Sequence, residues 1–363
     1  MKQFTINQND AGQRLDRFIG KAMPLLPSSL CQKYIRKKRI KINGKSASQN
    51  QKLVAGDVVT MYINDEFFTQ PSPSPSSPLS SPSPASFALD IIYEDKNILL
   101  LNKPAGMLCH AGARQGSTAI HDFNNTGRGS PIPTKNISDD KYNNSLISEV
   151  LRYLQASGGY DPSVETTFVP ALCNRIDRNT SGIVIAAKNA EALRIINEKL
   201  RLREIDKFYL AAVDGRPNPI EAKIEGFWTK DKQNNKATIV IGGDLPDGFA
   251  PSDSKRVITE YKTLTTRENI SLVECKLITG RSHQIRAHLS AIGHPIVGDK
   301  KYGCGKLKGA NNNETDTFQA LCSYKLRFSF KTDAGILSYH NEKTFIVKNI
   351  PFLTKYFGDN FRL

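Results

Sequence analysis

The sequence predicts an α+β protein with more strands than helices, and three of its features indicate this class. Short apolar runs, such as residues 98–101 (ILLL) and 207–213 (KFYLAAV), are typical of buried strands. Only a few longer segments carry apolar residues at helical spacing. An uncharged, Ser/Pro-rich stretch, residues 69–88, cannot bury a core and reads as a linker between a small and a large domain. We therefore expect a mixed, mainly antiparallel β-sheet with flanking helices in the large domain, and a small basic α+β domain before it.

The small domain, residues 1–68, is predicted to contain two helices followed by strands. A first helix is indicated by four apolar residues at helical spacing, Leu15, Phe18, Ile19 and Ala22. Ser28 or Ser29 is expected to cap a second helix that runs through Ile35. The stretch IKINGK then alternates like a strand and reaches a turn at Asn43–Gly44, and residues 53–63 (LVAGDVVTMYI) add another turn and strand.

The charge of the chain favours a polyanionic partner, either nucleic acid or an anionic membrane surface. The 50 Lys and Arg residues against 35 Asp and Glu give a net charge of +15. Up to Lys45 there are eleven Lys and Arg against two Asp. A basic helix followed by a hairpin suits RNA backbone, although a basic run can also be merely a solvated surface. The side chains of this domain that we expect to bind RNA are Lys33, Arg36, Lys37, Lys38, Arg39 and Lys41.

The sequence lacks the patterns that are typical of membrane-spanning, secreted, metal-binding and nucleotide-binding proteins. No apolar run approaches the roughly 18 residues that a membrane span needs, and the N-terminus has no apolar signal region, so we expect a cytoplasmic protein without a membrane partner. The six cysteines form no CxxC pair and the six histidines no HExxH, so we expect buried thiols and no metal. The nucleotide-binding patterns GxxxxGK[ST] and GxGxxG are missing, so nucleotide cofactors lose their best sequence signature.

The large domain, residues 89–363, is predicted to alternate strands with two clear helices. The stretch DIIYEDKNILLLNKPAG reads as two strands around a tight turn, and residues 112–144 read as a polar surface insertion. An amphipathic helix is expected in KNAEALRIINEKL and a strand in ISLVECKLIT. That strand runs through Gly280 into a second helix in SHQIRAHLSAIG, for which Ser282 is the expected cap and Gly293 the expected end.

One carboxylate has an unusual setting. In NRIDRNTSG, Asp177 stands between Arg175 and Arg178 and is followed by a turn-like run. By itself this is typical of a solvated loop with a weak ion pair. A GxSxG elbow is missing, and we find no second acid of the kind a glycosidase needs. A carboxylate that nearby cations keep ionised can serve as nucleophile or base, and the same cations attract RNA.

Five stretches in order resemble one family of RNA-modifying enzymes. NRIDRNTSG is similar to the HRLDxxTSG signature of pseudouridine synthases of the RluA, RluC and RluD type. The other four are YEDKNILLLNKPAG, KFYLAAVDG, LITGRSHQIRAHLSAIGHPIVGDKKYG and LCSYKLRF. In the small domain, GQRLDRFI, SSLCQKYIRKKRIKINGK and LVAGDVV resemble the alpha-L RNA-binding motif of ribosomal small-subunit protein S-four. The resemblance implies the pseudouridine synthase fold for the large domain.

The resemblance also implies a reaction, in which a uridine in RNA exchanges its C1′–N1 bond for a C1′–C5 bond without cofactor or metal. Asp177 would be the catalytic carboxylate, acting on the sugar either as nucleophile or as base. Tyr209 would lie against the uracil, and Arg286 would pair with Asp177, with Arg281 as the alternative. A uridine in folded RNA must be flipped out, and Arg175 would fill the vacated space. Arg178, Arg281 and Lys207 would contact RNA.

Each of these roles has an alternative. Tyr209 could belong to the core, Arg286 could contact a phosphate, and His283 is read as a structural hydrogen-bonding residue. Asn174 replaces the usual His, so a positioning role survives there but an acid–base role would not. We expect a monomer that acts on structured RNA, with large-subunit ribosomal RNA as the leading target. The alternatives are a synthase acting on transfer RNA and a catalytically silent ribosome-assembly factor.

Overall fold

The computed structural model describes residues 1–67, 89–110, 145–231, 236–242, 254–303, 318–358 and 361. The predicted linker 69–88 and the predicted insertion 112–144 lie outside these residues, as does Cys304. The chain divides into two compact units. The first consists of Met1–Ala88, His110–Ala171 and Ala187–Arg194, and the second of Leu89–Cys109, Leu172–Ala186 and Ile195–Leu363.

The first unit contains a four-stranded sheet in the order β1-β4-β2-β3, packed against two short helices. Its strands are β1 (Lys2–Thr5), β2 (Ile40–Ile42), β3 (Lys45–Ser46) and β4 (Val58–Met61). The predicted apolar face of helix α1 (Leu15–Ala22) is confirmed, because Leu15, Phe18 and Ile19 are fully buried. The turn between β2 and β3 is also confirmed. Asn43 and Gly44 have φ values of 51° and 75°, the positive values that an Asn-Gly hairpin turn requires.

The predicted serine cap of helix α2 (Ser28–Arg36) is wrong. Pro27 occupies the N-cap position, and no side chain caps the helix. Ser28 and Ser29 lie inside the exposed first turn, where water can satisfy the free N–H groups that a cap would otherwise bind. Helix α4 (Leu146–Ala156) and the short helix η1 (Asp65–Phe67) also belong to the first unit, and helix α5 (Ala190–Arg201) begins in it.

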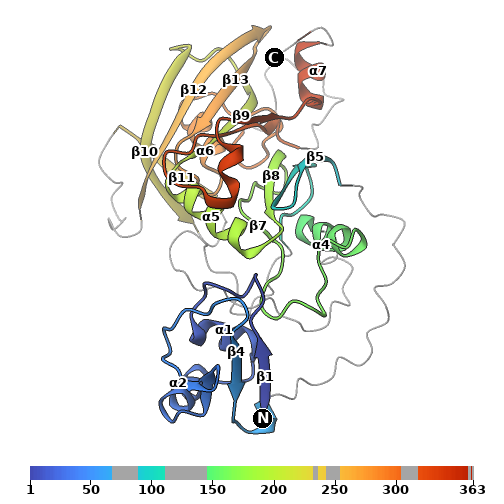
Figure 1. Ribbon diagram of the computed structural model, residues 1–363. Coiled ribbons are helices and arrows are strands. Elements are labelled where there is room, and N and C mark those ends of the chain that lie inside the picture. Colours follow the sequence, from blue (N-terminus) through green and yellow to red (C-terminus); the bar gives the residue numbers. More distant parts are fainter. Residues whose placement is uncertain are drawn as a thin grey trace. The chain divides into compact units, whose positions relative to one another are not determined.

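The second unit is built on a large mixed sheet (Figure 1). Among the described residues its main path runs β11-β10-β12-β13-β9-β14-β8-β6-β5, with β15 added to β14 and β7 added to β8. The bounds are β5 (Ile91–Glu94), β6 (Ile98–Lys103), β7 (Ala171–Leu172), β8 (Ser181–Ala187), β9 (Ile205–Asp214), β10 (Glu221–Asp231), β11 (Lys236–Ile241), β12 (Lys255–Arg267), β13 (Ile270–Leu277), β14 (Leu321–Phe328) and β15 (Thr344–Ile346). The pair β14–β8 is parallel, whereas β9 to β13 pair antiparallel. The predicted fold class is therefore confirmed.

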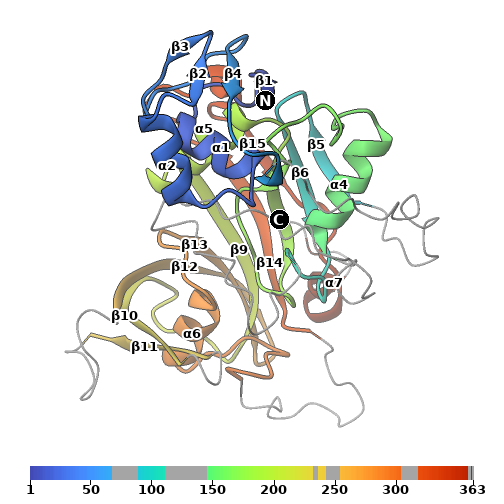
Figure 2. The same cartoon turned by 90° about the horizontal axis from the view of Figure 1, so that it is seen from below.

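Helix α6 (Gln284–Ala291) lies in the concave side of the curved strands β10 to β13 (Figure 2). Thr259 on β12 faces this helix, because its hydroxyl bonds with Nε2 of Gln284 at 3.0 Å and Nδ1 of His288 at 2.8 Å. Side chains alternate between the two faces of a strand, so the paired residues Tyr261, Cys275 and Tyr209 lie on the same face as Thr259. We call this the α6 face. Helix α7 (Pro351–Phe357) and the short helix η3 (Gly335–His340) follow later in the chain.

The opposite face of these strands carries alternating charges. One row across β10, β12 and β13 reads Glu221, Lys262 and Glu274, and the next reads Lys223, Glu260 and Lys276. Each row alternates in sign, so the three lysines and three glutamates balance. The charges of these two rows therefore cancel, and we call this the charge-balanced face.

The predicted Ser282 cap of α6 is also wrong. His283 is the N-cap residue, with φ of 58°, and no side chain caps the helix. Gln284 instead reaches back, and its Oε1 accepts hydrogen bonds from the Thr279 hydroxyl at 2.9 Å and the Arg281 N–H at 3.1 Å. Ser282 itself is exposed, and its carbonyl accepts a hydrogen bond from Trp228 Nε1 at 3.1 Å.

Candidate active site

The NRIDRNTSG stretch forms a closed loop between β7 and β8 that presents Asp177. The Cys173 N–H donates to the Ile185 carbonyl at 2.7 Å, and Oδ1 of Asn174 accepts the Ile185 N–H at 2.8 Å. Within the loop, the Thr180 N–H donates to the Asp177 carbonyl at 3.1 Å. Asn174 therefore bonds to the backbone of β8 and positions the loop, which is the role that its amide was expected to keep.

The Thr-Ser-Gly end of the loop is fixed against β14. Nε2 of Gln319, which is buried, donates to the Thr180 hydroxyl at 2.7 Å. Gly182 has φ of 112°, and a Cβ at this position would lie 2.2 Å from the Ser323 carbonyl oxygen. Only glycine allows so close an approach of two backbones at this φ. The glycine thus permits β8 to pair in parallel with β14, and this pairing fixes the position of the loop that carries Asp177.

A buried lysine ties the other side of the loop to the segment after β6. Nζ of Lys103 donates to the carbonyls of Pro104 at 2.7 Å, Met107 at 2.8 Å and Arg178 at 3.0 Å. The Lys103 side chain is fully buried, and this burial lowers its pKa to about 8. Arg178 joins the same junction, because its Nε donates to the Gly106 carbonyl at 2.9 Å. The structure therefore gives Arg178 a structural contact next to the acid.

We predict an alkaline limit of activity near pH 8 from this junction. An ammonium has three N–H donors for the three carbonyls, whereas a neutral amine has two, so the junction around Arg178 loosens as Lys103 loses its proton at about pH 8. In the unfolded chain a lysine keeps its proton up to a pKa of about 10.4. Between these pH values the unfolded chain binds more protons, so the contribution of Lys103 to the free energy of unfolding rises with pH.

The measurement is the pH profile of kcat together with thermal melting at each pH. The expected result is a fall in kcat above about pH 8 without a fall in melting temperature. Burial also lowers the pKa of Lys207, so Lys207→Gln is the control. If the fall in kcat at alkaline pH disappears in this variant, the effect belongs to Lys207 and the prediction is wrong.

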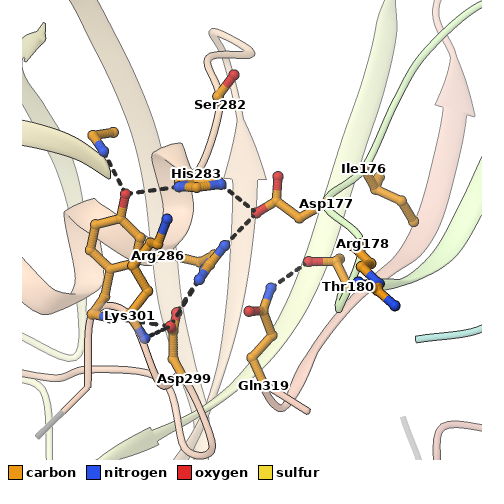
Figure 3. Close-up of polar contacts among 12 residues, drawn as sticks. Ile176, Asp177, Arg178, Thr180, Ser282, His283, Arg286, Asp299, Lys301 and Gln319 are labelled. Atoms are coloured by element: carbon orange, nitrogen blue, oxygen red, sulfur yellow. Dashed lines mark hydrogen bonds and ion pairs between the residues drawn. The ribbon is translucent and has the colours of Figure 1, made fainter. Parts of the chain in front are cut away.

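Asp177 faces a chain of buried charged groups on and after α6 (Figure 3). Nη1 of Arg286 lies 2.9 Å from Oδ2 of Asp177. The same guanidinium makes a bidentate pair with Asp299, from Nε to Oδ2 at 2.7 Å and from Nη2 to Oδ1 at 2.9 Å. Arg286 therefore bridges two carboxylates, one partly exposed and one fully buried. The planar fork of arginine suits such bridging, which lysine cannot reproduce.

Asp299 holds Arg286 in place. Its Oδ1 also accepts the N–H groups of Lys301 at 2.9 Å and Tyr302 at 3.1 Å. Although burial opposes ionisation, the hydrogen bonds and charge of Arg286 lower the pKa of Asp299. The pKa of Arg286 is raised in turn, since the two carboxylates outweigh the effect of its burial. The arrangement keeps a cation fixed beside Asp177.

His283 is the second side chain that faces Asp177. Its Nε2 lies 4.0 Å from Oδ2 of Asp177, and its Nδ1 lies 2.9 Å from the Tyr302 hydroxyl. Burial lowers the pKa of His283, so the imidazole is neutral near pH 7. By contrast, Ile176 and Arg178 point away from His283 and Arg286 (Figure 3).

Comparison with known proteins assigns this chain to a family. Residues 97–291 match the RNA pseudouridylate synthase family, which is more than half of the chain, and residues 13–59 match the S4 domain. The chain belongs to the RNA pseudouridylate synthase family. It is thus an isomerase with an S4 domain near its N-terminus, as the resemblance of its motifs implied.

Individual relatives agree over most of the chain. It is 30% identical to an uncharacterized RNA pseudouridine synthase of Mycoplasma genitalium over 90% of this chain and 88% of the relative. It is 31% identical to the ribosomal large subunit pseudouridine synthase C of Rickettsia bellii over 84% of this chain and 86% of the relative. The solved structure of human RNA pseudouridylate synthase domain containing 4 has the same fold, with a TM-score of 0.52 and 20% identity over 73% of this chain and 90% of that one.

Tyr209 of this synthase lies on the α6 face of β9 and is buried. Its hydroxyl makes a hydrogen bond with Ser323, and burial raises its pKa, so the phenol stays neutral. Lys207, two residues earlier, lies on the same face, with its Nζ close to Gly280. Burial lowers the pKa of Lys207, and no anion is bonded to it among the described residues. The strand thus aligns one aromatic ring and one amine along the α6 face.

The remaining predicted RNA contacts are surface residues. In the loop, Arg175 is exposed, and before α6, Arg281 is half-buried. In the S4 domain, Lys41 is half-buried and the other predicted cations are exposed, namely Lys33, Arg36, Lys37, Lys38 and Arg39. No helix in the described part of the chain is long and apolar enough to cross a membrane.

Three residues of the site were not predicted from the sequence, namely Asp299, Tyr302 and Gln319. Asp299 and Tyr302 lie in GDKKYG, the last part of the longest motif, so the motif itself could have pointed to them. A charged, Gly-flanked stretch of this kind reads as a surface turn, and only the fold shows that Asp299 is buried under α6. Gln319 follows residues that the structure does not describe, and nothing in its sequence context marks it.

Proposed function

We propose that this synthase isomerises uridines in large-subunit ribosomal RNA and that Asp177 is its catalytic carboxylate. The observation that carries the proposal is the bridge from Asp177 through Arg286 to the buried Asp299. A partly exposed carboxylate bonded to a fixed cation has a set orientation and keeps one side for a substrate. The target rests on the relatives that are named ribosomal large subunit pseudouridine synthases C and D.

The reaction requires little beyond this carboxylate, because it is a rearrangement. The C1′–N1 bond breaks, uracil turns, the C1′–C5 bond forms, and the hydrogen on C5 is lost while N1 gains one, so no proton or electron is consumed overall. Asp177 acts on the ribose, as a nucleophile at C1′ or as a base. The ring of Tyr209 lies on the α6 face of β9, where it can stack on the detached uracil. A neutral aromatic ring holds a base that must turn without bonding to it covalently.

Access to the uridine requires its extrusion from folded RNA, and the loop supplies a side chain for this step. Arg175 is exposed two residues before Asp177, on the same closed loop. Its guanidinium is suited to stack in the space that the base leaves. Lys207 and Arg281 contact the phosphates beside the flipped nucleotide, and the exposed cations of the S4 domain bind RNA backbone further along the chain.

The deciding experiment maps pseudouridines in total RNA from cells with and without this protein. The expected result is the loss of specific pseudouridines from large-subunit ribosomal RNA and their return when the wild-type protein is restored. Loss confined to transfer RNA would overturn the target, and an unchanged pattern would overturn the activity in the cell. Restoring Asp177→Asn instead of wild type tests the catalytic assignment in the same background.

We predict that cations of the S4 domain set the salt dependence of RNA binding. In the full-length protein, the triple variant Lys37→Gln, Lys38→Gln, Arg39→Gln removes three exposed charges after α2. Each lost phosphate contact should lower the slope of log K against log salt by about 0.7 to 0.9. The matched control is Lys223→Gln, Lys262→Gln, Lys276→Gln on the charge-balanced face, and its slope should match that of wild type. Equal slopes for the two triple variants would contradict the prediction.

A further inference from the structure

The two side chains that face Asp177 converge on the same oxygen. Arg286 Nη1 lies 2.9 Å and His283 Nε2 4.0 Å from Oδ2, whereas Oδ1 has no hydrogen-bond partner among the described residues. Figure 3 shows both contacts at one oxygen of the carboxylate, on the side of α6. The two oxygens of Asp177 are thus in different environments, and the reaction of the proposed function needs only one of them.

The hydrogen bonds around Tyr302 decide which nitrogen of His283 carries the proton. The Tyr302 hydroxyl oxygen accepts the Ala237 N–H at 2.7 Å, and its own hydrogen has no acceptor other than His283 Nδ1 in the described part of the chain. If the hydroxyl donates to Nδ1, the neutral imidazole carries its proton on Nε2. An N–H then faces the anionic Asp177, whereas the other tautomer would turn a lone pair toward it.

We propose that His283 is a positioning residue for Asp177: its Nε2–H donates to Oδ2 beside Arg286 and leaves Oδ1 as the oxygen that acts on the ribose. This inference rests on the proposed role of Asp177. At 4.0 Å the contact is longer than a hydrogen bond, and catalytic hydrogen bonds of this kind shorten when substrate is bound. Two donors on one oxygen fix the rotation of the carboxylate, which one donor alone cannot do.

The proposal predicts an effect of acidic pH. The charged and titratable groups that face His283 are Asp177 from the loop, Arg286 from α6, Lys230 from β10, and Lys301 and Tyr302 from the segment after α6. Burial lowers the pKa of His283, the charge of Asp177 opposes this, and the three cations act in the same direction as burial. Protonation turns Nδ1 from acceptor to donor, which reverses its hydrogen bond with the Tyr302 hydroxyl, and it places a second cation at Oδ2 that draws charge from the carboxylate. Activity should therefore fall at a pH below the 6.5 of an ordinary histidine.

The test compares His283→Gln with His283→Ala in the full-length enzyme, using pseudouridine formation on a purified RNA substrate. The amide Nε2 of glutamine can occupy the place of the imidazole Nε2 and donate an N–H that does not titrate. We expect kcat of His283→Ala to fall by about 10- to 100-fold, with KM and RNA affinity within about threefold of wild type. His283→Gln should recover most of this loss and lack the fall in activity at acidic pH.

Three controls separate positioning from folding. Residue 283 has φ of 58°, so alanine and glutamine carry a similar backbone cost that cancels in their comparison. Melting temperature and the fluorescence of Trp228, the single tryptophan, report whether the adjoining Ser282 loop keeps its place. His294→Gln makes the same chemical change at a histidine that bonds the Asp214 carbonyl away from this site, and its kcat should match that of wild type.

Tyr302→Phe is a second route that leaves His283 intact. It removes the hydroxyl that sets the tautomer and keeps the ring that packs on Arg286, 5.0 Å from the guanidinium carbon. We expect a smaller fall in kcat than in His283→Ala, again without a change in KM. The proposal is wrong if His283→Ala keeps wild-type kcat, if its defect lies in KM or RNA affinity, or if a folded His283→Gln is no better than His283→Ala. Turnover by Asp177→Asn would instead overturn the proposed function, whatever the His283 variants do.

Discussion

Asp177→Asn is expected to abolish pseudouridine formation while RNA affinity stays within a few-fold of wild type. Asparagine has nearly the same shape and can still accept the hydrogen bond from Arg286 Nη1, so the loop keeps its place. The amide, however, is neither a nucleophile nor a base at neutral pH. Loss of the carboxylate that we propose to react with the ribose should cost roughly a thousandfold or more in kcat, since a group that reacts directly with substrate has no substitute.

The measurement is single-turnover pseudouridine formation on purified RNA, alongside an RNA-binding titration of the same preparation. Asp214→Asn is the matched control, because Asp214 bonds to Asn269 at the end of β9 and makes no contact with Asp177. Turnover at a wild-type rate in Asp177→Asn would exclude the catalytic assignment. A loss of RNA affinity equal to the loss of rate would show instead that Asp177 serves binding.

Asp299→Asn should have the second largest effect, although Asp299 does not face the substrate. Its buried carboxylate makes both fork bonds to Arg286, and the amide can accept only one of them. The guanidinium then loses its charged partner in a buried position, which typically costs about 3 kcal/mol of stability. It can also turn away from Asp177, and misplacement of a catalytic group by about 1 Å can cost about 100-fold in rate.

Two measurements separate these effects. Thermal or denaturant unfolding gives the loss of stability, and kcat measured well below the melting temperature gives the loss of alignment. Substrate affinity should change little, because Asp299 is buried beneath Arg286. A variant that is destabilised but has wild-type kcat would show that Asp299 supports the fold without aligning Asp177. A loss of kcat in a protein of wild-type stability would still support alignment.

Much of this site could be predicted from the sequence, because its central residues lie in local patterns. Asp177 follows a short strand and precedes a Thr-Ser-Gly turn, and Arg286 lies on a helix whose apolar face is plain in the sequence. The α+β class and the antiparallel strands followed from apolar runs separated by turns. For these features, local sequence and tertiary structure agree.

The parts that could not be predicted depend on contacts between distant segments. Asp299 is typical of a turn residue until α6 places Arg286 over it, and nothing in the sequence around Lys103 indicates that three carbonyls surround its Nζ. The two helix caps failed for a related reason. Serine is a good N-cap in isolation, but α2 begins after Pro27 in an exposed turn, and α6 begins after His283, whose ring bonds to the Tyr302 hydroxyl.

The alternating charges on the face of the sheet opposite α6 have a consequence for how RNA arrives. Because the lysines and glutamates there cancel in pairs, that face contributes almost no long-range field at low salt. On the α6 side, Lys207 has no bonded anion among the described residues, and Arg286, Lys230 and Lys301 surround His283. A polyanion diffusing near this unit is therefore drawn from one direction. If Asp177 is the catalytic carboxylate, we expect RNA to be oriented toward it before any base is contacted, and collisions with the charge-balanced face to be short-lived.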